Sequence, residues 1–294
     1  MSSHDDPLFL FNKPDVSRAV KKVFQDITTM TYPVDAPHAI ILGGQPGAGK
    51  TTLADIFTEQ LEGNAIFISG DAYRKLHPNC SAIIDKYGRD GIPLMSAFSG
   101  AVTEELIDRA ASLKYNMVIE GTLRTTEVPL ETCRLLKGKG YQVDLACMAV
   151  KPLLSYFSTL LRFELMQEYG TTPRATPRDA HDNVVEKLGT NLDALYSADA
   201  FHRILLYTRL KYCIYDSSVM NTPPGTALKS VHDGTWSDAE LDQLKYSLQQ
   251  IETFMRKRIA AELPDFLVEK ETANIIIKSL DPPFCEEAQE ELEQ

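Results

Sequence analysis

The stretch that decides the fold is AIILGGQPGAGKTT, residues 39–52. Its first four residues form an apolar run typical of a buried strand, and Gly44 to Thr51 fit the pattern GxxxxGK[ST]. In this pattern the glycines let backbone N–H groups turn toward phosphate oxygens at the N-terminus of a following helix. A predicted strand precedes the pattern and a predicted helix follows it to about Leu61, so we interpret it as a phosphate-binding loop.

The loop supplies the expected nucleotide contacts. Lys50 is expected to reach the β- and γ-phosphates, and the Thr51 hydroxyl to bind Mg²⁺. No guanine-reading NKxD motif is present, which makes ATP the expected nucleotide. The alternative, a glycine-rich turn with a stray lysine, does not account for the flanking strand and helix. The expected nucleotide-binding residues are Gly44, Gln45, Gly47, Ala48, Gly49, Lys50, Thr51 and Thr52.

The rest of the chain alternates short apolar runs with helical patterns. This alternation predicts an α/β fold, a mainly parallel sheet with helices on both faces. The predicted strands are residues 39–42, 65–68, 116–120, 141–150, 203–207 and 213–215, and the predicted helices cover about 15–30, 50–61, 94–114, 130–139, from 152, and 180–196.

The C-terminal part is predicted to be helical. A capping box, with Ser237 as cap and Glu240 three residues on, starts a long amphipathic helix. We expect this helix to pack on the sheet, although a partner-binding helix is the alternative. We divide the chain into an N-terminal helix and linker (1–37), a core (38–235), and a C-terminal helical segment with an acidic tail (236–294).

Composition excludes several classes of function. The chain has 294 residues, 44% of them hydrophobic, and a net charge of −11, which argues against a general nucleic-acid binder. Its longest apolar runs fall far short of the roughly 20 residues that a membrane span needs. The five cysteines lack metal-ligand spacing. We therefore expect a cytoplasmic protein with reduced thiols and with neither a nucleic-acid nor a membrane partner.

Two carboxylates follow predicted strands at the edge of the sheet where ligands bind in such folds. Asp71 is our candidate for the base that accepts a hydroxyl proton during phosphoryl transfer, with a helix N-cap as its alternative role. Glu120 suits hydrogen bonding to substrate hydroxyls, or orienting water on Mg²⁺. Transfer also needs cations. The residues alone do not distinguish Arg162 and Arg174 from surface arginines.

Several segments, in order over about residues 38–216, resemble the zeta toxins of bacterial toxin–antitoxin systems, which are UDP-N-acetylglucosamine kinases. The segments YNMVIEGTLRT and RATP are far more specific than the phosphate-binding loop. The matching segments are residues 42–52, Gly70-Asp71, His77-Pro78, 115–125, Val128-Pro129, 139–141, Ser155-Tyr156, 159–164, 174–177 and His181-Asp182.

The resemblance implies a P-loop kinase-like three-layer α/β/α fold that transfers the γ-phosphate of ATP, with Mg²⁺, to the 3′-hydroxyl of the sugar of UDP-N-acetylglucosamine. In the family the product interferes with peptidoglycan precursor synthesis, and a small helical antitoxin protein blocks the site. By position, the catalytic residues would be Lys50, Asp71, Arg162 and Arg174, and the substrate-binding residues Glu104, Glu120, Arg124 and Thr132.

Some features depart from the family pattern. Little matches after about residue 217, and Leu123 occupies a position that varies in the family and could alter the sugar pocket. The alternative to a UDP-N-acetylglucosamine kinase is a P-loop kinase that acts on another hydroxyl substrate, such as another UDP-sugar, a nucleotide or a drug.

Overall fold

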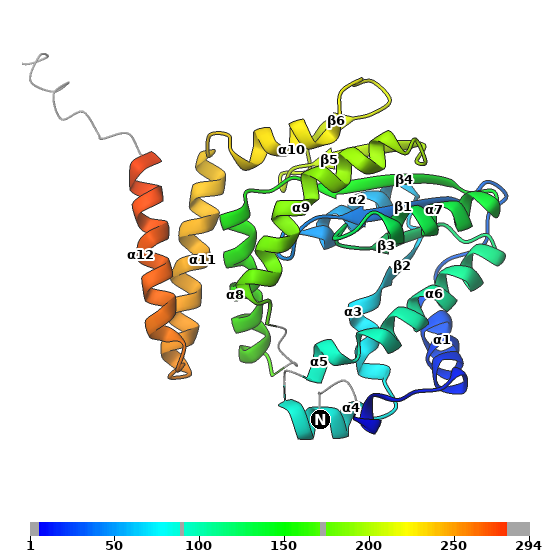
Figure 1. The fold of residues 1–294 in the computed structure, drawn as a ribbon, viewed down its shortest axis with the longest axis horizontal. Helices are drawn as coiled ribbons and strands as arrows, with labels where there is room; N and C mark the ends of the chain where they lie inside the picture. Colours follow the sequence, from blue (N-terminus) through cyan, green and yellow to red (C-terminus); the bar gives the residue numbers. More distant parts are fainter. Residues whose placement is uncertain (1–5, 89–90, 171–174, 281–294) are drawn as a thin grey trace, which may run out of the picture.

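The computed structural model describes residues 6–88, 91–170 and 175–280. A six-stranded sheet in the order β2-β3-β1-β4-β5-β6 forms its centre (Figure 1). The first five strands in this order are parallel, and β6 pairs antiparallel with β5. The strands are β1 (His38–Gly43), β2 (Ile66–Ser69), β3 (Met117–Glu120), β4 (Gln142–Met148), β5 (Arg203–Tyr207) and β6 (Cys213–Asp216).

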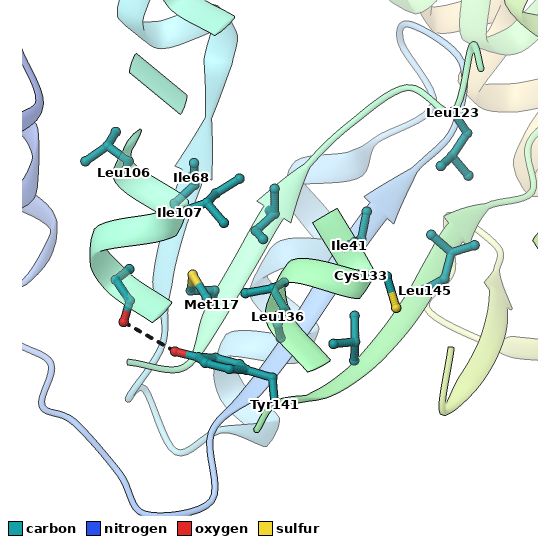
Figure 2. Close-up of a cluster of buried hydrophobic side chains, with 14 of the residues drawn as sticks. Ile41, Ile68, Leu106, Ile107, Met117, Leu123, Cys133, Leu136, Tyr141 and Leu145 are labelled. Carbon is teal, nitrogen blue, oxygen red and sulfur yellow. Dashed lines mark hydrogen bonds between the residues drawn. The ribbon is translucent and has the colours of Figure 1, made fainter. Parts of the chain in front are cut away.

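The apolar runs of the strands are continuous because both faces of the sheet are covered. In β1, Ala39 and Ile41 belong to one hydrophobic cluster, whereas Ile40 and Leu42 belong to another on the opposite face. Figure 2 shows part of the first cluster, where Ile41 and Leu145 of the sheet meet helical side chains. The predicted α/β class with a mainly parallel sheet is confirmed.

The helices form a layer on each face. Residues of α1 (Lys13–Ile27), α6 (Ser96–Ser112), α7 (Glu127–Gly138), α9 (Arg178–Ser197) and α10 (Pro224–His232) contribute to the first cluster. Residues of α2 (Lys50–Gln60), α8 (Pro152–Glu168), α11 (Asp238–Lys257) and α12 (Leu263–Leu280) contribute to the second. Among the described residues, no helix combines the length and apolar character that crossing a membrane requires.

The C-terminal helix forms as predicted. Ser237 and Glu240 make both hydrogen bonds of the capping box at the start of α11. The main neighbour of α11 is α8, and Figure 1 shows α11 and then α12 outside α8 rather than directly on the sheet. The predicted packing against the sheet is thus made largely through α8, and α11 side chains join the hydrophobic cluster on that face.

Short helices between β2 and α6 were not predicted, and neither was α10. Between β2 and α6 the chain is interrupted by His77-Pro78 and by Gly88, so no stretch in this segment is long enough to show a helical period. The unpredicted elements are η2 (Pro7–Phe9), α3 (Gly70–Tyr73), η3 (Arg74–Leu76), α4 (Cys80–Tyr87), α5 (Gly91–Leu94) and α10.

A buried ion cluster ties three strands together at the edge of the sheet opposite the phosphate-binding loop. Asp144 of β4 is fully buried and accepts hydrogen bonds from Arg203 Nε (2.7 Å) and His202 Nδ1 (3.0 Å). His38 Nε2 lies 3.1 Å from the same carboxylate. Burial raises the pKa of Asp144, but hydrogen bonds from His38 and Arg203 outweigh it and hold the pKa below its ordinary value.

The Asp144 pKa fixes a pH dependence of stability. The pKa of Asp144 is lower in the folded chain than in the unfolded chain. The ionised carboxylate therefore stabilises the fold above pH 3.8, and this stabilisation is lost as the pH falls through the pKa of Asp144 in the folded chain. We expect Asp144→Asn to lower the free energy of unfolding at neutral pH by about 2 kcal/mol. Urea unfolding should show that the difference in free energy of unfolding between Asp144→Asn and the unchanged protein becomes smaller from neutral pH to about pH 3. Asp35→Asn, on an exposed loop, should unfold with the same free energy as the unchanged protein. A deficit independent of pH would contradict the assignment.

The α11 capping box should contribute measurably to stability. Ser237→Ala removes the hydroxyl that accepts from the Glu240 N–H and should cost about 1 kcal/mol. Thermal unfolding would measure the loss. Ser279→Ala, near the end of α12, is the matched control because its hydroxyl donates only within its own helix. Equal stability of the two variants would contradict a role for the cap.

Candidate active site

The candidate site lies where the parallel strands end. The register pairs Glu120 with Leu42 of β1 and with Ser69 of β2, so these three residues meet at one edge of the sheet. The glycine-rich loop leaves β1 at this edge and enters α2 at Lys50. The two predicted carboxylate positions and the phosphate-binding loop are thus neighbours.

The loop backbone needs its glycines. Gly44, Gly47 and Gly49 have φ angles of 129°, 76° and 97°, a region that side chains disfavour. A Cβ atom on Gly47 would lie 2.1 Å from the carbonyl oxygen of Ser155, so the loop rests directly on the first turn of α8. Gly49 caps α2 without a side-chain hydrogen bond, which leaves the first N–H groups of the helix suited to an anion.

Four charged side chains converge on the loop. Lys50 Nζ donates to the carbonyl oxygens of Gly44 (3.1 Å) and Gln45 (3.4 Å). Burial lowers the pKa of Lys50. Glu120 and Asp71 are near enough to raise this pKa, and Arg162 of α8 is near enough to lower it. Asp71, Glu120 and Arg162 therefore each lie near enough to Lys50 for their charges to act on it.

The two carboxylates are held by neighbouring side chains. Asp71 Oδ1 lies 2.8 Å from Arg74 Nη2, and the Asp71 side chain is 51% exposed. Glu120 Oε2 accepts a hydrogen bond of 2.5 Å from Ser69 Oγ. The N-cap position of α3 is Ser69, so the alternative role of Asp71 as the cap is wrong.

The remaining predicted residues that the structure describes lie on α2, on α6, after β3 and on α7. Thr51 is exposed at the start of α2. Glu104 is exposed on α6, next to Thr103, which packs against Gly70. Arg124 is exposed after β3, and Thr132 is half-buried on α7; Thr52, also predicted, is half-buried on α2. Arg174 lies outside the described residues.

Leu123 does not line the site with its side chain. It has a φ of 54° and is buried in the hydrophobic cluster beside Gly43, where a Cβ would come within 2.2 Å of Leu123 Cδ1 (Figure 2). Its carbonyl oxygen accepts a hydrogen bond of 2.8 Å from Asn191 Nδ2 of α9. Any effect of Leu123 on a sugar pocket would therefore pass through the backbone. No local sequence pattern marks Asn191.

Gln45 belongs to the loop, but its side chain points into the protein. It is fully buried, and Nε2 donates to the Val150 carbonyl oxygen (2.7 Å) and to Ser155 Oγ (3.3 Å). Only the backbone of Gln45 is thus available to a nucleotide. The close packing of the loop on α8 keeps this side chain inside the protein.

Sequence reasoning missed Arg209, which holds the loop through hydrogen bonds to its backbone. From the turn between β5 and β6, its guanidinium donates to the carbonyl oxygens of Gly47 and Ala48 and to Ser158 Oγ (2.9 Å). Burial lowers its pKa to about 10, so it stays charged at neutral pH. No motif marks this arginine, because its role depends on a turn 162 positions from Gly47.

Comparison with known proteins identifies the family of this chain. The family model described as zeta toxin matches residues 20–220. Toxin PezT of Streptococcus pneumoniae serotype 4 is 38% identical over 250 residues, which cover 84% of this chain and 98% of the relative. Toxin zeta of Streptococcus pyogenes is 36% identical over 251 residues, or 85% of each chain.

Solved structures show the same architecture. A structure from a characterisation of the PezAT chromosomal toxin–antitoxin system of Streptococcus pneumoniae has a TM-score of 0.78 at 34% identity, covering 85% of this chain and all of the other. A complex of AvrRxo1-ORF1 and AvrRxo1-ORF2 with ATP shares the fold, with a TM-score of 0.52 at 14% identity over 83% and 85% of the chains. The predicted P-loop kinase-like fold is confirmed, and the chain belongs to the zeta toxin family.

Proposed function

We propose that this protein is an ATP- and Mg²⁺-dependent kinase that phosphorylates the 3′-hydroxyl of the sugar of UDP-N-acetylglucosamine. It acts as the toxin of a toxin–antitoxin system by blocking peptidoglycan precursor synthesis. The observation that carries the proposal is the convergence of Lys50, Asp71, Glu120 and Arg162 on one glycine-rich loop. Membership of the zeta toxin family supports it.

The loop suits the phosphates of ATP. Its glycines have positive φ angles, which let backbone N–H groups turn toward phosphate oxygens, and the ammonium of Lys50 lies at the loop itself. Within the described residues no group of three or more His, Cys, Asp or Glu side chains could hold a metal, so Mg²⁺ would be held by Thr51 together with phosphate oxygens. Bound ATP would supply the phosphoryl group, and Mg²⁺ would neutralise part of its charge.

The two carboxylates would handle the sugar that accepts the phosphoryl group. Asp71 would take the proton of the sugar hydroxyl as the oxygen bonds to phosphorus. Its ion pair with Arg74 fixes its orientation at the end of β2. Glu120, held by Ser69, would orient the sugar, with Glu104, Arg124 and Thr132 around it. Lys50, Arg162 and Arg174 would stabilise the charge that spreads over the transferred group.

The partner and location follow from the same family. A small helical antitoxin that covers the nucleotide site would keep the kinase inactive, and a structural relative comes from a characterised toxin–antitoxin system. A substrate used in peptidoglycan precursor synthesis places the activity in the cytoplasm. Neither role calls for a nucleic-acid or membrane partner.

The first test is mass spectrometry of UDP-N-acetylglucosamine after incubation with the protein, ATP and Mg²⁺. The expected product carries one more phosphoryl group on the sugar. Unchanged UDP-N-acetylglucosamine, with ATP binding intact, would contradict this substrate. The other hydroxyl substrates, namely other UDP-sugars, nucleotides and drugs, would then be screened in the same assay.

Asp71→Asn tests the base. The amide keeps the shape of the side chain but cannot accept the proton, so kcat should fall by about 10²–10⁴-fold. The Kd for ATP should stay close to that of the unchanged protein, because the substitution leaves the loop intact. Asp85→Asn, exposed on α4 in the same part of the chain, is the matched control and should keep full kcat. Full activity of Asp71→Asn would exclude Asp71 as the base.

Arg209→Met tests the hydrogen bonds that Arg209 donates to the loop backbone. Methionine fills part of the space but donates no hydrogen bond to Gly47 or Ala48, so the loop should lose its fixed shape. We expect the Kd for ATP, measured by calorimetry with Mg²⁺ and a non-hydrolysable analogue, to rise about tenfold. Arg18→Met, at a position 75% exposed on α1, should leave it unchanged. Equal Kd values of the two variants for the ATP analogue would contradict a role for Arg209 in holding the loop.

A further inference from the structure

Three fully buried polar side chains lie behind the phosphate-binding loop and have no part in the proposed reaction. They are Gln45 of the loop, Ser155 of α8 and His181 of α9. Buried polar groups are costly unless they are hydrogen-bonded, and these form a connected chain. His181 Nε2 lies 2.8 Å from Ser155 Oγ, which in turn accepts from Gln45 Nε2 (3.3 Å). Being buried, His181 cannot touch a substrate.

The direction of the hydrogen bonds follows from the charges. His181 Nδ1 lies 2.8 Å from Asp182 Oδ1, and a carboxylate only accepts, so Nδ1 carries a proton. Burial lowers the pKa of His181, which favours the neutral ring, so Nε2 is the acceptor. The Ser155 hydroxyl therefore donates to His181, and its lone pairs face Gln45. A Ser155 proton given to the Pro152 carbonyl, 2.9 Å away, would instead require a buried imidazolium.

The chain ends at the groups that hold Lys50. Both N–H bonds of the Gln45 amide are used, toward Val150 and Ser155, which fixes the side chain. The backbone carbonyl oxygen of the same glutamine accepts from Lys50 Nζ at 3.4 Å. The Ser155 carbonyl oxygen packs directly against Gly47. A shift of Ser155 would thus move the loop at two points.

The other end of the chain is anchored at the start of α9. Asp182 also accepts 2.7 Å from Arg178 Nε, and the Arg178 guanidinium lies 4.2 Å from the Tyr156 ring centroid. The Tyr156 hydroxyl donates to Glu269 of α12 at 3.1–3.2 Å. Residues from α8, α9 and α12 therefore hold His181 in one orientation.

We propose that His181 is a positioning residue: through Ser155 and Gln45 it sets the geometry of the phosphate-binding loop and of Lys50. The consequence for turnover rests on the proposed kinase function, but the consequence for nucleotide binding does not. Losing the His181 acceptor lets the Ser155 hydroxyl turn to the Pro152 carbonyl oxygen, 2.9 Å away, and so changes the lone pair that the hydroxyl presents to Gln45 Nε2. The loop then populates positions in which Lys50 and the backbone N–H groups no longer converge.

The test compares His181→Phe with His181→Gln. Phenylalanine keeps the ring but offers Ser155 no acceptor, whereas the Gln side-chain oxygen can accept from it. We expect the Kd for a non-hydrolysable ATP analogue with Mg²⁺, measured by calorimetry, to rise about tenfold in His181→Phe and about twofold in His181→Gln. His202→Gln, at a half-exposed histidine at the opposite edge of the sheet, should bind as the unchanged protein does.

A merely structural role would lower the unfolding temperature of both His181 variants without changing the affinity of the folded fraction. Unchanged affinity in folded His181→Phe therefore overturns the proposal. If His181→Phe does not fold, Ser155→Ala replaces it, since alanine keeps the backbone under Gly47 and removes only the hydroxyl. Unchanged affinity in Ser155→Ala likewise overturns it. Because the readout is nucleotide binding, a protein inactive on UDP-N-acetylglucosamine leaves this test intact.

Discussion

The nucleotide site depends on the contact between two backbones, where Gly47 of the loop meets the Ser155 carbonyl oxygen at the first turn of α8. No side chain fits between them, so the loop is pressed against the helix. Two consequences follow from this contact. The side chain of Gln45 turns inward and donates to Val150 and Ser155. The carbonyl oxygen of Gly47 accepts a hydrogen bond from Arg209.

Charge is concentrated at this point in an otherwise acidic chain. The net charge is −11, yet Lys50, Arg162 and Arg209 all lie at or near the loop. Burial alone would favour the neutral form of Lys50, and the carboxylates of Glu120 and Asp71 oppose this effect. The two carboxylates that would handle the acceptor hydroxyl therefore also oppose the effect of burial on the Lys50 pKa.

Local patterns predicted the parts of the fold that local sequence determines. The buried strands, the glycine-rich loop and the capping box at Ser237 each depend on neighbouring residues, and the structure contains them. The helices between β2 and α6 are too short and too interrupted to show a period. The supporting side chains of Arg209 and Asn191 act on segments distant in sequence, so no local pattern marks their role. His181 lies in a segment that resembles the family, but local sequence does not indicate its contact with Ser155. For Arg162, only the family resemblance distinguished it from a surface arginine.

The contacts that hold the loop also set an order of assembly. Gln45 meets Ser155 across 110 positions, and Arg209 meets Gly47 across 162. Domains fold from the N-terminus during synthesis, and contacts between distant segments close late. Until Ser155 and Arg209 have been synthesised, the complete glycine-rich motif lacks both of its supports. A chain that stops before residue 209 would thus carry every residue of the motif but lack the hydrogen bonds from Arg209 that hold the loop.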